Sequence, residues 1–316
     1  MGRYILSRLL QAVPVVFLVS ILAFMIMVLI PGDPAELLAG DQSSPEVVQR
    51  IRDQLGLNRP LGVRFVDYYK HLFRGDLGHS IFFNDDVTTT VLNRLPFTFT
   101  LAGFAGVTAV VFGVFLGILA VANINQRPWF DQILSVLSVA GITIAGFLLA
   151  ILLILLFSVK LAWFPTGGYV PLTRDFATGL RSLVLPALTL ALPNIAYLAR
   201  MTRSCMLDVY QADYIATARA KGLAERTVLL RHALKNALIP VLTIVGFIFG
   251  RLMVGAVVTE TIFYLPGFGR MLLVAVQRRD YPLIQGAMLL IGIVFVAINL
   301  ITDVAYCYLD PRIRYN

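Results

Sequence analysis

Charged residues are scarce in the apolar parts of this sequence, and the few that occur there are the first candidates for chemistry. Arg251 lies within an apolar run from Ala237 to Val258, and Asp303 lies near the end of the run that begins at Leu283. A charge is costly to bury inside a membrane, so such residues are functional candidates by default. The alternative is a structural role, in which Arg251 pairs with Asp303 or with a group on a partner chain.

Residue patterns of familiar catalytic and ion-coupled sites do not occur in the sequence. It has no HExxH motif, no nucleophile placed beside a base, no filter-like carbonyl loop and no Walker A loop. His71, His79 and His232 lie outside the apolar runs, so no relay is placed for an ion-coupled carrier. Cys205 and Cys307 lack metal-ligand spacing. We therefore expect a chain that catalyses nothing and binds no metal or cofactor itself.

The elements that position these residues must lie in a membrane. Of the 316 residues, 58% are hydrophobic and only 14% are charged, whereas an average soluble domain has about a quarter charged residues. This composition argues against a soluble enzyme, a free nucleic-acid-binding protein and a secreted disulfide scaffold.

Six apolar stretches are long enough to cross a bilayer, which takes about 20 residues. They predict an all-α polytopic protein with transmembrane helices at about Leu9–Ile30, Phe97–Ala122, Ile133–Val159, Leu183–Leu198, Ala237–Val258 and Leu283–Tyr306. Pro186 and Pro193 interrupt the fourth, but neighbouring helices can satisfy the carbonyls that a proline frees. The first stretch resembles a signal peptide, yet its apolar run is too long for one, so we interpret it as an uncleaved span.

The distribution of Lys and Arg sets the orientation. Six spans place both termini on one side, where twelve Lys and Arg residues fall, against six in the opposite short loops. Residues 31–96 are left out of this comparison because long segments translocate largely regardless of their charge. Both termini are therefore predicted to be cytoplasmic, and the net charge of +8 reflects topology rather than a nucleic-acid partner.

The outer segment, residues 31–96, is patterned as a folded element. A serine followed by Pro45 suits the start of a helix that Gly56 ends, and the apolar residues from Phe65 to Phe73 repeat with helical spacing. We expect a small helical cap that packs on the span ends, docks an outside protein, or does both.

The cytoplasmic segment from Arg200 to Asn236 is polar and basic but rich in helix-forming residues. Gly222 divides it into two predicted short helices, which would form a knuckle protruding from the membrane. Tyr214 and Leu223 would then be exposed to water unless a partner receives them. A solvated connector is the alternative. Small residues on the first helix would let a partner approach closely: Ala216, Ala218 and Ala220.

Taken together, these features resemble the permease subunits of bacterial dipeptide/oligopeptide ABC importers, and the resemblance covers the whole chain. The motifs that carry it follow one another in family order: Pro31–Gly32–Asp33–Pro34–Ala35, Leu55–Gly56–Leu57 with Arg59–Pro60, Gly75–Asp76–Leu77–Gly78, Asp213–Tyr214 with Thr217–Gly222, His232–Pro240, Thr259–Phe263 with Pro266–Arg270, Arg279–Pro282 and Asp310–Arg314. Any one of them is weak evidence, whereas the ordered series is specific.

The resemblance implies that the cytoplasmic segment is the coupling loop of an ABC importer. The residues implied to contact an ATPase are Asp213, Ala216, Thr217, Ala218, Gly222, Glu225 and Arg226. Ala216 stands where the general pattern has Glu, and Lys235 stands where it has Pro, so Asp213 is one candidate for the role of the missing acid. The resemblance also makes Arg251 a hypothetical path-lining charge for a peptide carboxylate. The outer loop is implied to be structural, with Glu260 holding its shape together with Pro266, Gly267 and Gly269.

The partners that the resemblance implies are all separate chains or small molecules. Two ATPase subunits would hold ATP and Mg²⁺ and drive alternating access, as in a type I importer. A second, similar permease subunit would complete the path, because six spans enclose only half of one. A periplasmic or surface-anchored binding protein would deliver the peptide to this chain in the lipid of the bacterial inner membrane.

The expected organisation is a first span at residues 1–30, an outer segment at 31–96, a permease core at 97–310 that includes the coupling loop 200–236, and a tail at 311–316. The nearest alternatives share this architecture and carry nickel, glutathione, opines or sugar oligomers. An ion-coupled secondary carrier is an alternative from another class, although the inverted repeats typical of one are not seen. An ABC exporter half is a third, which the outer-segment motifs argue against.

Overall fold

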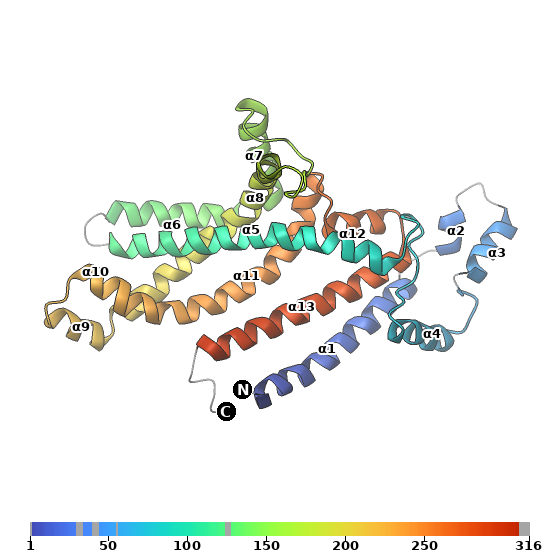
Figure 1. Cartoon of the computed structure of the whole chain (residues 1–316), viewed down its shortest axis with the longest axis horizontal. Coiled ribbons are helices and arrows are strands. Elements are labelled where there is room, and N and C mark those ends of the chain that lie inside the picture. Colours follow the sequence, from blue (N-terminus) through green and yellow to red (C-terminus); the bar gives the residue numbers. More distant parts are fainter. Residues whose placement is uncertain (1, 30–33, 40–43, 55, 124–127, 310–316) are drawn as a thin grey trace. The chain divides into compact units, whose positions relative to one another are not determined.

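The computed structural model describes residues 2–29, 34–39, 44–54, 56–123 and 128–309, and these form an almost wholly helical chain (Figure 1). Within those ranges, sheet pairing is limited to an isolated bridge between His79 and Asp86. The prediction of an all-α fold is therefore confirmed. Most of the Pro31–Ala35 motif and all of Asp310–Arg314 lie outside the described residues.

The chain divides into two compact units, which are described separately. Unit 1 comprises Met1–Pro96 and Arg270–Leu300, and unit 2 comprises Phe97–Gly269 and Ile301–Asn316. The helices are α1 (Gly2–Leu29), α2 (Pro34–Ala39), α3 (Pro45–Gln54), α4 (Leu61–Phe73), α5 (Val87–Ala122), α6 (Pro128–Thr143), α7 (Gly146–Leu153), α8 (Phe176–Tyr210), α9 (Asp213–Ala220), α10 (Glu225–Thr227), α11 (Leu234–Ile262), α12 (Phe268–Gln277) and α13 (Tyr281–Leu309). Two π-helical segments, η1 (Ile154–Lys160) and η2 (Val228–Ala233), continue α7 and precede α11.

In unit 1, the short helix α4 packs against the first span. The Phe24 ring of α1 meets the Phe65 ring edge-on with centroids 5.2 Å apart, and the hydroxyls of Ser20 and Tyr69 are hydrogen-bonded at 2.6 Å. Helix α13 lies close to α1, because a Cβ on Gly292 would come within 2.5 Å of Val19 Cγ1. Aromatic packing thus holds the outer segment on the first span, and the lack of a side chain at Gly292 lets the last span approach the first closely.

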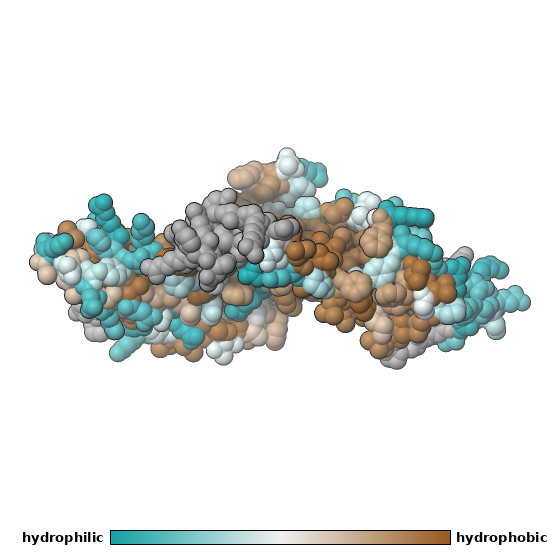
Figure 2. Space-filling model, turned by 90° about the horizontal axis from the view of Figure 1, so that it is seen from below, coloured by the Kyte–Doolittle hydropathy of each residue, from teal (hydrophilic) through white to brown (hydrophobic). Residues whose placement is uncertain are grey.

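The two helices predicted for the outer segment are present as α3 and α4. Helix α3 starts at Pro45, and the chain turns at Gly56, as the pattern indicated. Figure 2 shows mainly hydrophilic residues at the end of unit 1 that carries α2 and α3. Helix α4 carries large apolar side chains that are exposed, among them Val63, Val66 and Phe73.

In unit 2, α5 packs tightly on α8 through a pair of glycines, Gly113 and Gly117. A Cβ on Gly113 would lie 2.6 Å from Leu198 Cβ, and one on Gly117 would lie 2.6 Å from Thr202 Cβ. In lipid, such close backbone approach replaces the hydrophobic drive between helices. Helix α8 also packs against α6 and α11, which makes it the central helix of this unit.

Five helices of the described ranges are long and apolar enough to cross a membrane: Ser7–Ile26 within α1, α5, α8, the continuous helix Glu225–Ile262, and Tyr281–Ile301 within α13. The fourth predicted span extends further than expected, since α8 tolerates Pro186 and Pro193 over 35 residues. A sixth span exists if α6 and the α7–η1 helix are taken as one bent pair.

The third predicted span is not the straight helix that was expected. Its two parts, Asp131–Thr143 and Gly146–Lys160, meet at an angle of 105°. Ala145 between them has an extended backbone with ψ of 132°. Thr143 donates from its hydroxyl to the Val139 carbonyl at 2.8 Å, a contact that often bends helices. The bend escaped prediction because no proline marks it.

Candidate functional site

The segment 200–236 of unit 2, which the sequence predicts to be a coupling loop, has a hydrophobic core of its own. Ile215 of α9 is fully buried between the end of α8 and the start of the next helix. The buried residues of this cluster are Val121, Met206, Ile215, Ala218, Val228, Leu229, Ala233 and Ala237. The knuckle is therefore a packed element fixed to the spans, so movement of its surface would be passed on to α8 and α11.

Gly222 makes the turn that the sequence assigned to it. Its N–H donates to the Arg219 carbonyl at 2.9 Å, and Leu223 N–H donates to the Ala218 carbonyl at 3.4 Å. Its φ is +76°, and a Cβ placed there would have no neighbour within 4 Å. The position thus needs glycine for its left-handed backbone and not for space.

The second helix of the knuckle is not the short separate helix that was predicted. Helix α10, η2 and α11 form one continuous helix from Glu225 to Ile262. No residue between His232 and Asn236 breaks the helical backbone, and Pro240 lies within α11 without ending it. The knuckle therefore consists of one short helix, α9, turned back onto the cytoplasmic end of a span.

The exposed surface of the knuckle is only part of the predicted contact set. Tyr214 and Leu223 are 43% and 40% exposed, and Ala216 and Thr217 also face outward. Ala218, in contrast, is 7% exposed and belongs to the core cluster, so its assignment to a partner contact is corrected. Figure 2 shows mainly hydrophilic residues, with a few hydrophobic ones among them, at the end of unit 2 that carries α9 and α10.

Three residues form a polar clip across the turn. The Tyr210 hydroxyl donates to the Glu225 carboxylate, and Arg219 donates to the same carboxylate at 3.0 Å. The Arg219 guanidinium also lies 4.2 Å from the centroid of the Tyr210 ring. Glu225 was named from the sequence, whereas Tyr210 and Arg219 were missed because only the folded turn brings them together.

A side-chain hydrogen bond also joins α9 to α11. The Asn236 side-chain amide donates to the Tyr214 hydroxyl at 2.8 Å. Asp213, in the first turn of α9, and Arg226 are both exposed. The surface around Gly222 therefore presents acidic side chains (Asp213 and Glu225) and basic ones (Arg219, Lys221 and Arg226) beside small and apolar ones.

At the other end of α11, Glu260 is the centre of a buried polar set. It is fully buried, and the Thr98 hydroxyl donates to its Oε1 at 2.6 Å. Thr98 Oγ1 in turn accepts from the Phe268 N–H at 2.9 Å. These contacts join α5, α11 and the start of α12.

The glycines of the outer loop leave room for this carboxylate. A Cβ on Gly267 would overlap the Glu260 carboxylate, and one on Gly269 would lie 3.0 Å from Glu260 Oε2. Pro266 precedes them and is partly buried. Helix α12, which follows directly, was not predicted, because its ten residues are too few for a span and were taken as loop.

Arg251 is exposed on α11, and its guanidinium carbon lies 5.5 Å from the centroid of the Tyr197 ring of α8. The suggested pairing with Asp303 involves a side chain outside those described. Over the described ranges, no group of three His, Cys, Asp or Glu residues is placed to hold a metal ion.

The chain is similar to membrane components of transport systems along its whole length. Residues 109–315 match the family described as binding-protein-dependent transport system inner membrane component, and residues 1–102 match the N-terminal part of such membrane components. A Brucella abortus (strain 2308) protein named as a peptide transport system permease is 48% identical over 316 residues, covering all of both chains.

Two further comparisons agree with this. The glutathione transport system permease protein GsiC of Escherichia coli O6:H1 is 41% identical over 315 residues, again covering all of both chains. The solved structure of the MetNI methionine ABC transporter in inward-facing conformations matches with a TM-score of 0.55 at 15% identity, over 71% of this chain and 97% of that chain. The last likeness is one of fold.

Proposed function

The chain belongs to the family of binding-protein-dependent transport system inner membrane components, and we propose that it is the permease subunit of an ABC importer whose cargo is short peptides. It is a multi-pass protein of the inner membrane and a transport component rather than an enzyme. The peptide assignment is supported by the relative that is 48% identical over the whole chain and is named for peptide transport.

Coupling to ATP hydrolysis is proposed to run through the knuckle. Two separate ATPase subunits would hold ATP and Mg²⁺, and one would receive the surface around Gly222. The residues proposed to contact or orient that subunit are Asp213, Ala216, Thr217, Gly222, Glu225 and Arg226, with Ala218 supporting them from the core. The observation that favours this is the packed cluster beneath α9, because a rigid knuckle can transmit movement and a loose connector cannot.

The path itself is proposed to be shared. The spans of this chain would enclose half of a path, and a second, similar permease subunit would complete it. A periplasmic or surface-anchored binding protein would deliver the cargo to the outer side. Glutathione is a second candidate cargo, favoured by the relative that is 41% identical and named for it; it is itself a tripeptide, so the two proposals differ in selectivity rather than in mechanism.

Arg251 is proposed to line the path and meet the carboxylate of the cargo. Its exposure on α11 favours this role, whereas its cation–π contact with Tyr197 is the structural alternative. In the Arg251→Ala variant, the apparent affinity for peptide uptake should fall while the thermal stability changes little. An unchanged affinity with a lowered unfolding midpoint would assign the residue to packing.

Affinity purification of this chain in mild detergent tests the assembly. The proposal expects a second permease-like chain and one or two ATPases to co-purify, and a short peptide on any binding protein that is captured. Recovery of the chain alone, stable and moving solute in liposomes with only an ion gradient, would contradict it and favour a secondary carrier.

A further inference from the structure

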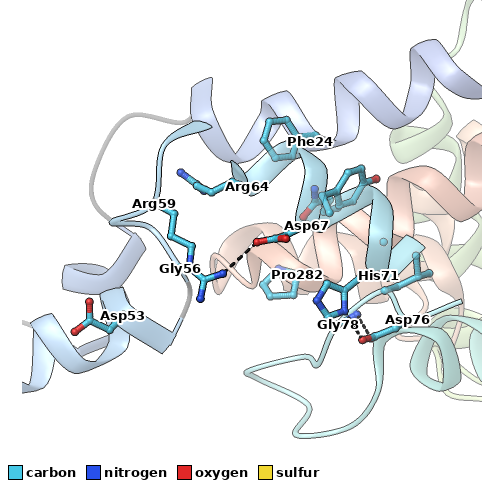
Figure 3. Close-up of a pocket in the computed structure, with 14 residues that line it drawn as sticks. Phe24, Asp53, Gly56, Arg59, Arg64, Asp67, His71, Asp76, Gly78 and Pro282 are labelled. Carbon is cyan, nitrogen blue, oxygen red and sulfur yellow. Dashed lines mark hydrogen bonds and ion pairs between the residues drawn. The ribbon is translucent and has the colours of Figure 1, made fainter. Parts of the chain in front are cut away.

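Unit 1 contains a pocket that the transport cycle described above does not use. It has a volume of about 390 Å³, within the range of small-molecule sites. Apolar side chains of three elements form part of its wall, namely Phe24 of α1, Leu77 of the turn after α4, and Pro282 of α13. Polar side chains of α4 and of the loop before it line the same space (Figure 3).

The carboxylates around this pocket already have partners. Asp67 accepts from Arg59 at 3.1 Å and from Lys70 at 3.4 Å. Asp76 lies 2.9 Å from His71 Nδ1 and accepts from the Gly78 N–H at 2.9 Å, which together hold the pKa of this carboxyl below its ordinary value. Figure 3 shows the Arg59–Asp67 and His71–Asp76 pairs on the pocket wall.

Two side-chain hydrogen-bond donors on α4 have no acceptor in the described ranges. The Arg64 guanidinium makes no hydrogen bond or ion pair with any residue of the described ranges, and burial lowers its pKa. The Tyr68 hydroxyl is buried and likewise has no partner there. Arg64 and Tyr68 are four residues apart and so lie on one face of the helix. Burial raises the pKa of Tyr68 to about 12, so its hydroxyl stays a donor.

A buried donor without an acceptor costs free energy, and the buried Tyr68 hydroxyl together with the partly buried Arg64 guanidinium on one pocket wall indicates a ligand with acceptor oxygens. A guanidinium presents a planar fork that matches a carboxylate. We propose that this pocket binds the carboxylate of a small ligand through Arg64 and Tyr68. The inference rests on the proposed function for the ligand's class, since the free C-terminus of a short peptide has this chemistry and the apolar wall suits its side chains.

Weak binding to the complete transporter, without its binding protein, tests the proposal directly. The probes are trialanine, its C-terminal amide and inorganic phosphate. Saturation-transfer NMR measures the binding of each probe to the transporter in nanodiscs. Trialanine should bind, and the amide should bind at least tenfold more weakly. Arg64→Gln should weaken trialanine at least tenfold, and Tyr68→Phe should weaken it severalfold. Arg74→Gln, a change of the same kind on an exposed residue beyond the end of α4 that does not line the pocket, should leave binding unchanged.

Equal binding of trialanine and its amide, or wild-type affinity in Arg64→Gln, would overturn the proposal, as would binding of phosphate alone. Within the described ranges the Arg64 side chain and the Tyr68 hydroxyl have no hydrogen-bond partner to lose, and Tyr68→Phe keeps the ring contacts with Phe24 and Tyr69, so neither variant should unfold. Peptide uptake by cells that carry the wild-type chain is measured in parallel. Peptide uptake without Arg64-dependent binding would support the proposed function and contradict this site. Arg64-dependent binding of trialanine without peptide uptake would support this site and contradict the proposed function.

Discussion

Individual buried contacts hold the outer end of unit 2, and Thr98 is the clearest of them. Its hydroxyl donates to Glu260 and accepts from the Phe268 N–H. Thr98→Val keeps the shape and removes both bonds, so it should destabilise the protein by about 1–3 kcal/mol. The thermal unfolding midpoint of the purified protein in detergent measures this.

Thr90 provides the matched control on the same helix. Its hydroxyl is also buried but has no hydrogen-bond partner in the described part of the chain. Thr90→Val should therefore be neutral or stabilising. Equal losses in the two variants would show that the Thr98 contacts contribute nothing beyond side-chain shape.

A second prediction at the residue scale concerns space. A Cβ at Gly267 would overlap the Glu260 carboxylate, so Gly267→Ala should cost about 1–3 kcal/mol through overpacking. Gly146→Ala makes the same change where no neighbour lies within 4 Å and should be tolerated. Loss of folded protein on heating compares the two, and similar behaviour would count against the packing described for this loop.

Residue identity predicted some of these roles but not their partners. Glu260 was expected to be structural, because an acid in an outer-loop motif suits that role, and its full burial fits this expectation. Thr98 was missed because it lies 162 residues away in the sequence. Ala218 was placed on the wrong side of α9, since spacing alone does not say which face of a short helix packs on the spans.

At the scale of elements, the turn at Gly222 gives the sharpest prediction. A residue with a side chain costs about 1–2 kcal/mol in this left-handed conformation, and asparagine tolerates it better than leucine. Gly222→Leu should therefore reposition α9 and uncouple ATP hydrolysis from uptake, whereas Gly222→Asn should retain most coupling. The measurement is the number of ATP molecules hydrolysed per peptide imported, and an unchanged ratio in Gly222→Leu would refute the assignment of this element.

The start of α8 should respond to acid. The Asp175 carboxylate accepts from the Thr178 hydroxyl at 2.6 Å and from the N–H groups of Thr178 and Ala177, which lower its pKa. A lowered pKa in the folded state means that the cap stabilises fully above the ordinary value of about 3.9 and is lost as the pH falls through the folded value.

Asp175→Asn keeps an acceptor oxygen at the cap and removes the titration. Thermal midpoints between about pH 3 and pH 7 should therefore fall more in the wild type than in this variant at the acid end. Parallel curves would show that the cap does not contribute to the acid sensitivity.

Element types were predictable from hydrophobic patterns, and element shapes were not. Apolar length located the spans, Pro45 and Gly56 located α3, and the helical spacing of apolar residues from Phe65 to Phe73 located α4. The bend after Thr143 lies where Ala145 adopts an extended backbone, and α10 continues into α11 without a break. Neither the bend nor the continuous helix is predicted by a residue pattern in the sequence alone.

At the scale of the whole molecule, the described spans carry few charged residues. The family match, the fold likeness and the packed knuckle together favour a subunit that is driven from the cytoplasm and supplied from outside. Cargo specificity is proposed to lie in the partners and in a few residues such as Arg251 and Arg64, which is why the cargo could be predicted from the sequence only through a family resemblance.

The most direct test reconstitutes the complex that co-purifies with this chain into liposomes and follows entry of a radiolabelled dipeptide. Assignment to an ABC importer leads us to expect uptake that requires ATP on the side of the termini and a binding protein on the other side, with no effect of a proton or sodium gradient. Uptake driven by an ion gradient without ATP would contradict it.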